Sequence, residues 1–117
     1  MADNMKYDLA SGVISLTKAS VSSGEVGEIQ DLVYFAETDS NSSNSFQARF
    51  GVFVAEVPVK GETTTNAAIA IGDNLYWDEA AGLVNADNTN GKLCGKALAA
   101  VSSGATTTIE VLFNIPA

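Results

Sequence analysis

The chain has 117 residues, of which 46% are hydrophobic and 17% charged, a composition typical of one globular domain and too apolar for a disordered chain. Fourteen acidic residues against six basic ones give a formal net charge of -8, which argues against a surface that binds phosphate backbones or anionic membranes. The sequence contains no histidine, which excludes Ser-His-Asp and Cys-His catalysis and every imidazole metal site. Nucleic-acid binding, membrane binding and much of enzyme chemistry are therefore not expected.

The N-terminal stretch differs from the rest of the chain. Residues 1–11 are largely polar and predict an extended arm, in which Met1, Met5 and Tyr7 are candidate apolar anchors, whereas residues 12–117 predict a single β domain. The single cysteine, Cys94, cannot form an internal disulfide. No apolar run approaches the roughly 20 residues of a membrane-spanning helix.

Short apolar runs separated by Gly, Ser, Asn and Thr clusters predict an all-β fold, either a small antiparallel β-barrel or a β-sandwich. A first strand is expected over residues 12–18. A second is expected over 26–35, with a bulge or break near Gln30 and Asp31 because its apolar residues do not alternate cleanly. The polar stretch 38–45 is typical of a surface loop.

The next predicted strand, over residues 49–59, is apolar on both faces. One face carries Phe53, Ala55, Val57 and Val59, and the other carries Phe50, Val52 and Val54. This pattern indicates a strand buried on both sides, or one that passes from the barrel interior into a subunit contact. Pro58 favours an edge strand or a strand end.

Four further segments complete the expected sheet. After a tight corner at Gly72 and Asp73, a strand is expected to carry Leu75 and Trp77 on one side. The Asn90-Gly91 pair is the strongest hairpin signal and predicts that the segments around Val84 and Leu93 pair with each other. The segments 93–101 and 106–115 are expected to form a terminal hairpin.

The acidic residues near these corners predict turns rather than a reaction centre. A calcium loop read from Asn85 or Asp87 has no glycine at its sixth position and no glutamate at its twelfth. The serine pairs before Gly24 and Gly104 have no Ser-x-x-Lys partner. We therefore expect no catalytic residue, no metal and no cofactor, and a hydrolase using Asp78 and Glu79 is the weakest of the alternatives.

A series of turn and core positions runs through most of the chain from about Ser22 onward. Its upstream part is Ser23-Gly24-Glu25, Val33 and Gly51-Val52-Phe53. Its downstream part is Gly72-Asp73, Tyr76-Trp77-Asp78, Gly82, Gly95-Lys96-Ala97, Gly104-Ala105-Thr106-Thr107 and Val111-Leu112. With these motifs the chain resembles the capsid cement or head decoration proteins of tailed bacteriophages, a similarity that rests on turns and core positions rather than on a catalytic signature. The chain departs from the family pattern in the loop 39–45 and in an acidic tip near Glu25 and Glu28.

The resemblance implies a non-enzymatic structural protein of the virion, made in the bacterial cytoplasm. It would sit on the outer surface of the phage head, bind the major capsid protein and its own copies as a homotrimer at local three-fold axes, and stabilise the expanded lattice. The candidate capsid or subunit contacts are Met1, Met5, Tyr7, Phe50, Val52 and Val54. The alternative is a small β-barrel interaction or carbohydrate-binding module of a tail or fibre, with Tyr76 and Trp77 as a sugar-stacking platform.

Overall fold

The computed structural model describes residues 11–116, so the expected arm with Met1, Met5 and Tyr7 lies outside the described residues. Within this part of the chain there are eight strands and no helix, which confirms the all-β fold class. The strands are β1 Ser11–Thr17, β2 Val26–Ile29, β3 Leu32–Ala36, β4 Ser45–Lys60, β5 Asn74–Asp78, β6 Leu83–Asn85, β7 Lys92–Ala97 and β8 Thr106–Ile115.

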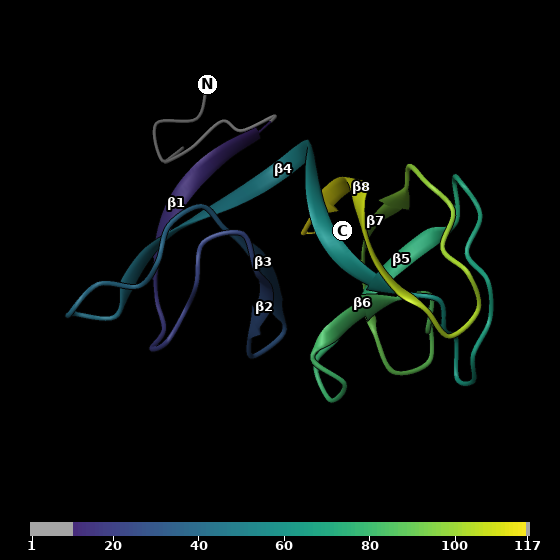
Figure 1. Cartoon of the computed structure of the whole chain (residues 1–117). Helices are drawn as coiled ribbons and strands as arrows, with labels where there is room; N and C mark the ends of the chain where they lie inside the picture. The colour runs from purple at the N-terminus through teal and green to yellow at the C-terminus, as the bar shows by residue number, and fades with distance from the viewer. Residues whose placement is uncertain (1–10, 117) are drawn as a thin grey trace, which may run out of the picture.

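β4 is the long strand that two parts of the molecule share (Figure 1). Its first half, residues 45–51, pairs antiparallel with β1, and β3 joins it at Ala48 and Arg49. Its second half, residues 51–60, pairs antiparallel with β8. Gly51 has a φ of 102°, a conformation that residues with a Cβ rarely adopt, so glycine lets β4 bend where its partners change.

The second half of β4 belongs to a closed five-stranded barrel. Around the barrel the order is β4, β8, β7, β5 and β6, and a parallel contact between Val59 and Val84 returns β6 to β4. β1, β2 and β3 form an extra sheet on the first half of β4 (Figure 1). The structure thus selects the barrel from the two architectures expected from the sequence.

The two halves of β4 bury opposite faces. In the first half the even-numbered Phe46 and Phe50 are buried in the extra sheet, and in the second half the odd-numbered Val57 and Val59 are buried in the barrel. Successive side chains of a strand point to opposite faces, so the two cores lie on opposite sides of β4. Both faces of β4 are therefore apolar because one is buried in the extra sheet and the other in the barrel.

Aromatic side chains connect the extra sheet to the barrel. Phe35 of β3 lies 5.5 Å from Phe53 of β4 and 5.7 Å from Phe113 of β8, measured between ring centroids. An ion pair adds to this junction, because Lys92 of β7 donates to the Glu28 carboxylate of β2 at 3.0 Å. The two parts are consequently packed against each other and are not joined by β4 alone.

Two irregularities expected from the sequence have defined structures. The break near Gln30 and Asp31 is confirmed: it is the turn of the hairpin between β2 and β3, where Gln30 adopts a φ of 54°. Pro58 lies within β4, opposite Thr108 of β8. Its missing N–H falls on the other edge of the strand, where no ladder bond is lost.

The hairpin predicted at Asn90 and Gly91 is wrong. The segments around Val84 and Leu93 do not pair with each other, because β6 and β7 lie on opposite sides of β5. The Asp87 carboxylate accepts hydrogen bonds from the N–H groups of Thr89 and Asn90, which folds residues 87–90 into a compact turn of their own. A Cβ on Gly91 would lie 2.6 Å from the Cβ of Tyr76, so this glycine serves a close approach to β5 rather than a two-residue hairpin turn. The predicted pairing of the last two strands is confirmed between β7 and β8.

Candidate interaction surface

Three exposed aliphatic side chains and one partly buried leucine form an apolar strip on the outside of the barrel. We call it the outer stripe, and it consists of Val52, Val54, Leu93 and Leu112. Val52 and Val54 are 55% and 51% exposed although they lie in the middle of β4. Val54 is the cross-strand neighbour of Leu112, so regular pairing with β8 holds the stripe in place.

A hollow of about 200 Å³ is lined by residues of the outer stripe, Val52, Leu93 and Leu112, together with Gly95. Lys96 stands at its rim and donates from Nζ to the side-chain oxygen of Asn74 at 2.8 Å. The hollow is therefore apolar inside and polar at one side, an arrangement suited to a protruding aliphatic side chain of a partner.

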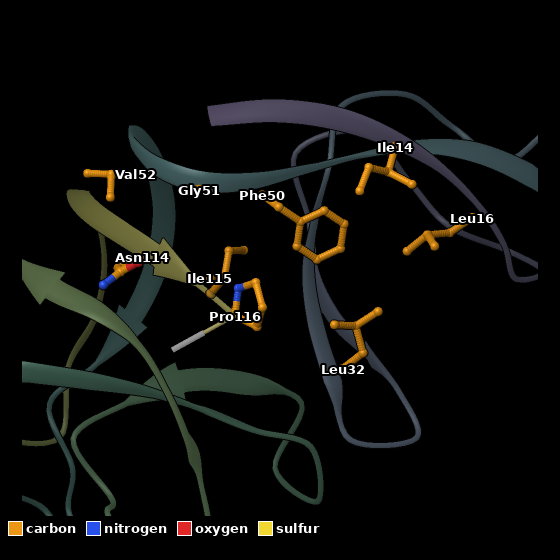
Figure 2. Close-up of a pocket in the computed structure, with 9 residues that line it drawn as sticks. All are labelled: Ile14, Leu16, Leu32, Phe50, Gly51, Val52, Asn114, Ile115 and Pro116. Atoms are coloured by element: carbon orange, nitrogen blue, oxygen red, sulfur yellow. The ribbon is translucent and has the colours of Figure 1, made fainter. Parts of the chain in front are cut away.

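A larger apolar groove of about 530 Å³ continues from the outer stripe toward the extra sheet. Figure 2 shows Ile14, Leu16 and Leu32 on one side of it and Ile115 and Pro116 on the other. Val52 and Asn114 line both this groove and the hollow beside Leu93. The groove and the outer stripe thus form one continuous apolar surface.

The structure brings together part of the predicted contact set. Val52 and Val54 lie in the outer stripe, whereas Phe50 is only 6% exposed and forms a wall of the groove (Figure 2). Met1, Met5 and Tyr7 lie outside the described residues. The assignment of these six residues to a capsid or subunit contact stays a prediction.

Sequence reasoning missed Leu93 and Leu112. Leu112 is the apolar member of the outward-facing series in β8, between Glu110 and Asn114, and this exception to the alternation was a usable signal. Leu93 gave no such signal, because a register shift between Leu75 and Tyr76 of the neighbouring strand disturbs the alternation of β7.

A pair of like charges borders the outer stripe. Glu56 of β4 and Glu110 of β8 are direct cross-strand neighbours, both exposed, on the same face as Val54 and Leu112. Within residues 11–116, neither carboxylate has a hydrogen bond or ion pair. Like charges directly opposite each other are unfavourable in a sheet. This part of the surface therefore favours a neighbour that brings positive charge.

The aspartates at the predicted corners stabilise turns, as the sequence indicated. Asp87 is buried and accepts from the side chain and backbone of Asn90, and this side-chain hydrogen bond lowers the pKa of the Asp87 carboxyl. Asp78 accepts from the N–H of Ala81 at 3.1 Å. In the described part of the chain, no group of three or more His, Cys, Asp or Glu side chains is placed to hold a metal ion.

Neither Trp77 nor Cys94 is presented to a ligand. Trp77 is 9% exposed in the barrel and donates from Nε1 to Glu79 Oε1 at 2.8 Å, so its ring does not offer a face on which a sugar could stack. Cys94 is fully buried, and burial raises the pKa of its thiol to about 12. A thiol with this pKa is a poor nucleophile at neutral pH.

Comparison with known proteins identifies the family of the chain. The family model described as phage cement protein matches residues 8–113. No curated protein and no solved structure matches the chain. Over residues 11–116 no helix is long and apolar enough to cross a membrane. Because the match covers most of the sequence and the all-β barrel is the architecture expected from the resemblance, the chain belongs to the phage cement protein family and is associated with a phage capsid.

Proposed function

We propose that this protein binds the outer surface of the assembled phage head and stabilises the expanded lattice. The observation that supports this proposal most directly is the outer stripe. The side chains of Val52 and Val54 are half exposed although both residues lie in the middle of β4. A protein that binds the assembled lattice better than its free subunits shifts the equilibrium toward the intact shell by mass action, so no catalysis is required.

The proposed partners are the major capsid protein and further copies of this chain, as a homotrimer at local three-fold axes. Val52 and Val54 supply the apolar contact, Phe50 supports the adjoining groove, and Met1, Met5 and Tyr7 of the arm add contacts to the shell. The net charge of -8 argues against nucleic acid and anionic membranes as partners. Repetition over many copies lets a modest interface, on the order of 1,000 Å², have a large summed effect.

Co-sedimentation with undecorated heads of the cognate phage tests the proposal. We expect saturable binding to expanded heads and none to unexpanded proheads, with the copy number per capsomer given by the saturation level. The absence of binding to either form would refute the head-surface assignment.

A pair of variants locates the contact. Val54→Asp places a charge in the outer stripe and should reduce head binding by at least about tenfold, since a buried unpaired charge costs more than 1.4 kcal/mol. Thr106→Asp adds the same charge at an exposed position of β8 opposite Lys60 and should bind like the natural chain. Equal loss in both variants would mean that the stripe is not the contact.

A further inference from the structure

The second half of β4 has one edge that no described strand covers. β1 and β8 both pair with β4 at Gly51, so they lie on opposite edges of this strand. β6 and β8 likewise both pair with β4 at Val59. β1 and β6 therefore flank the same edge, and between them residues 52–57 have no strand partner on that side within residues 11–116. We call these residues the open edge.

Backbone direction shows which groups the open edge presents. The N–H of Lys18 donates to the carbonyl of Asn44 at 2.7 Å, so even-numbered residues of β4 direct their N–H and C=O groups toward β1. The register of β4 with β1 and with β8 has no shift, so the same parity holds along the strand. The groups that face the open edge belong to Val52, Val54 and Glu56. A row of such groups is a template for another strand.

We propose that an extended segment of the major capsid protein, apolar and carrying a Lys or Arg, adds to the open edge as a further strand. The proposal rests on the head-binding function and specifies how that contact is made. In strand addition of this kind, main-chain hydrogen bonds supply affinity and side-chain pockets supply specificity. The six residues of the open edge match the length of an ordinary strand.

The two faces of the open edge define the side chains that fit it. Cross-strand neighbours point to the same face of a sheet. Segment residues opposite Phe53 and Ala55 would therefore contact side chains that the barrel leaves partly exposed. Segment residues opposite Val52 and Val54 would extend the outer stripe. An apolar segment would thus bury apolar surface on both of its faces.

A cavity of about 200 Å³ adjoins the open edge at the end nearer β6. Val57 and Pro58 of β4 line it together with Trp77 of β5 and Leu83 of β6. Because these walls are apolar, an aliphatic side chain of the added segment is the group that fits between them. The cavity therefore offers the specificity pocket that accompanies the row of backbone groups.

Charge along the open edge favours a basic residue in the segment. Glu56 and Glu110 are cross-strand neighbours with like charge, and neither has an ion pair within the described part of the chain. A Lys or Arg opposite Glu56 would lie on the same face and offset this repulsion. Glu25, which lines the cavity near β6, adds a further acidic group.

A second copy of the open edge does not meet this requirement. Residues 52–57 include Glu56 but no basic residue, so pairing two open edges would leave that carboxylate without a counter-charge. Each copy also carries a formal net charge of -8, which opposes the approach of the two edges. A basic segment of another protein is therefore the better match.

Amide hydrogen exchange of the free and the head-bound protein tests the strand addition. The three N–H groups of the open edge should exchange at least about tenfold more slowly on expanded heads. The N–H groups of Phe53, Ala55 and Val57 face β8 and should change by no more than about twofold. Head binding without the tenfold gain would overturn the strand addition and leave the head-binding function standing. The absence of head binding would refute both.

The same measurement on the free protein identifies other occupants of the open edge. We expect fast exchange of its three N–H groups at every protein concentration. Slow exchange that disappears when residues 1–10 are removed would overturn the proposal, because the chain itself would then protect the edge. Slow exchange that increases with protein concentration would also overturn it, because the partner would then be a second copy.

A matched pair of variants removes a single donor from the open edge. Pro58 shows that β4 accepts proline at a position of this parity, where the missing N–H faces away from β8. Glu56→Pro and Glu56→Ala both lack the carboxylate, but only Glu56→Pro lacks the N–H. We expect Glu56→Pro to bind heads at least about tenfold more weakly than Glu56→Ala, with circular dichroism confirming that both are folded. Equal affinities of the two folded variants would overturn the proposal.

Charge reversal at the same position tests the basic residue of the segment. Glu56→Lys keeps the N–H and should bind expanded heads at least about tenfold more weakly than the natural chain at low salt, because two basic side chains would then face each other. The difference should shrink as the salt concentration rises. Unchanged binding of Glu56→Lys at low salt would refute a Lys or Arg opposite Glu56.

Discussion

The two halves of β4 belong to one strand but pair with different strands and bury opposite faces. The first half lies between β1 and β3, and its buried side chains Phe46 and Phe50 face the extra sheet. The second half has β8 along one edge, and its buried side chains Val57 and Val59 face the barrel. The outward series continues past Gly51 as Val52 and Val54, where nothing in residues 11–116 covers it. Val52 and Val54 of the outer stripe therefore continue the series of Phe46 and Phe50 beyond the extra sheet that buries these two phenylalanines.

The largest effects should come from one aromatic residue in each core. Phe46→Ala in the extra sheet and Phe113→Ala in the barrel each remove a fully buried ring and should each lower the free energy of unfolding by about 3–5 kcal/mol. Because Phe35, Phe53 and Phe113 join the two parts, we expect one cooperative urea transition in both variants. Two separate transitions by circular dichroism and fluorescence would show that the halves unfold independently.

A matched pair of valines separates the two faces of the second half. Val57→Ala empties a buried position of the barrel and should cost about 2–3 kcal/mol in urea denaturation, whereas Val54→Ala, half exposed, should change stability by less than about 0.5 kcal/mol. Only Val54→Ala should weaken co-sedimentation with heads. Similar losses of stability in the two variants would mean that Val54 is part of the core.

Gly51→Ala tests the bend between the halves. The φ of 102° is unfavourable for a residue with a Cβ, so we expect a loss of about 1–2 kcal/mol in the urea unfolding free energy. Gly12→Ala in β1, which pairs with Phe50 next to the bend, is the control and lacks a positive φ. A stable Gly51→Ala protein would show that β4 can change partners without this conformation.

One effect on stability is confined to alkaline pH. Burial raises the pKa of Cys94 from 9.0 to about 12, so its contribution to stability is fully present below pH 9 and is lost as the pH rises through 12. Cys94→Ala should therefore show a shallower fall of the urea midpoint between pH 9 and pH 11. Burial also raises the pKa of Tyr34 in the extra sheet, so Tyr34→Phe should reduce the slope in the same direction above pH 10. Unchanged slopes in both variants would contradict this account.

Local sequence patterns predicted much of the fold. The all-β class, the break at Gln30, the pairing of the last two strands and the turn role of Asp87 all follow from side chains that act on their own backbone neighbourhood. Val52 and Val54 could also be predicted from the sequence as candidate contacts, because an apolar series on both faces of one strand is an unusual pattern.

Other features depended on which strands pair with one another in the folded protein. The Asn90-Gly91 pair is compatible with a two-residue hairpin, yet β5 lies between β6 and β7 and pairs with both of them. Leu93 and Leu112 are far apart in the chain, and only strand pairing brings Leu112 beside Val54 and places Leu93 in the same hollow as Val52. The same holds for Glu56 and Glu110, whose like charges become neighbours through the register of β4 and β8.

The sequence by itself thus determined the secondary structure class, the positions of most turns and the two apolar faces of β4, since these depend on alternation and on short-range hydrogen bonds. Tertiary structure decided which of those faces is buried. Phe50 and Val52 belong to the same apolar series, but Phe50 is buried and Val52 is 55% exposed, and β4 bends at Gly51 between them. Burial is a property of the strands that surround a residue, and the residue's own chemistry does not specify it.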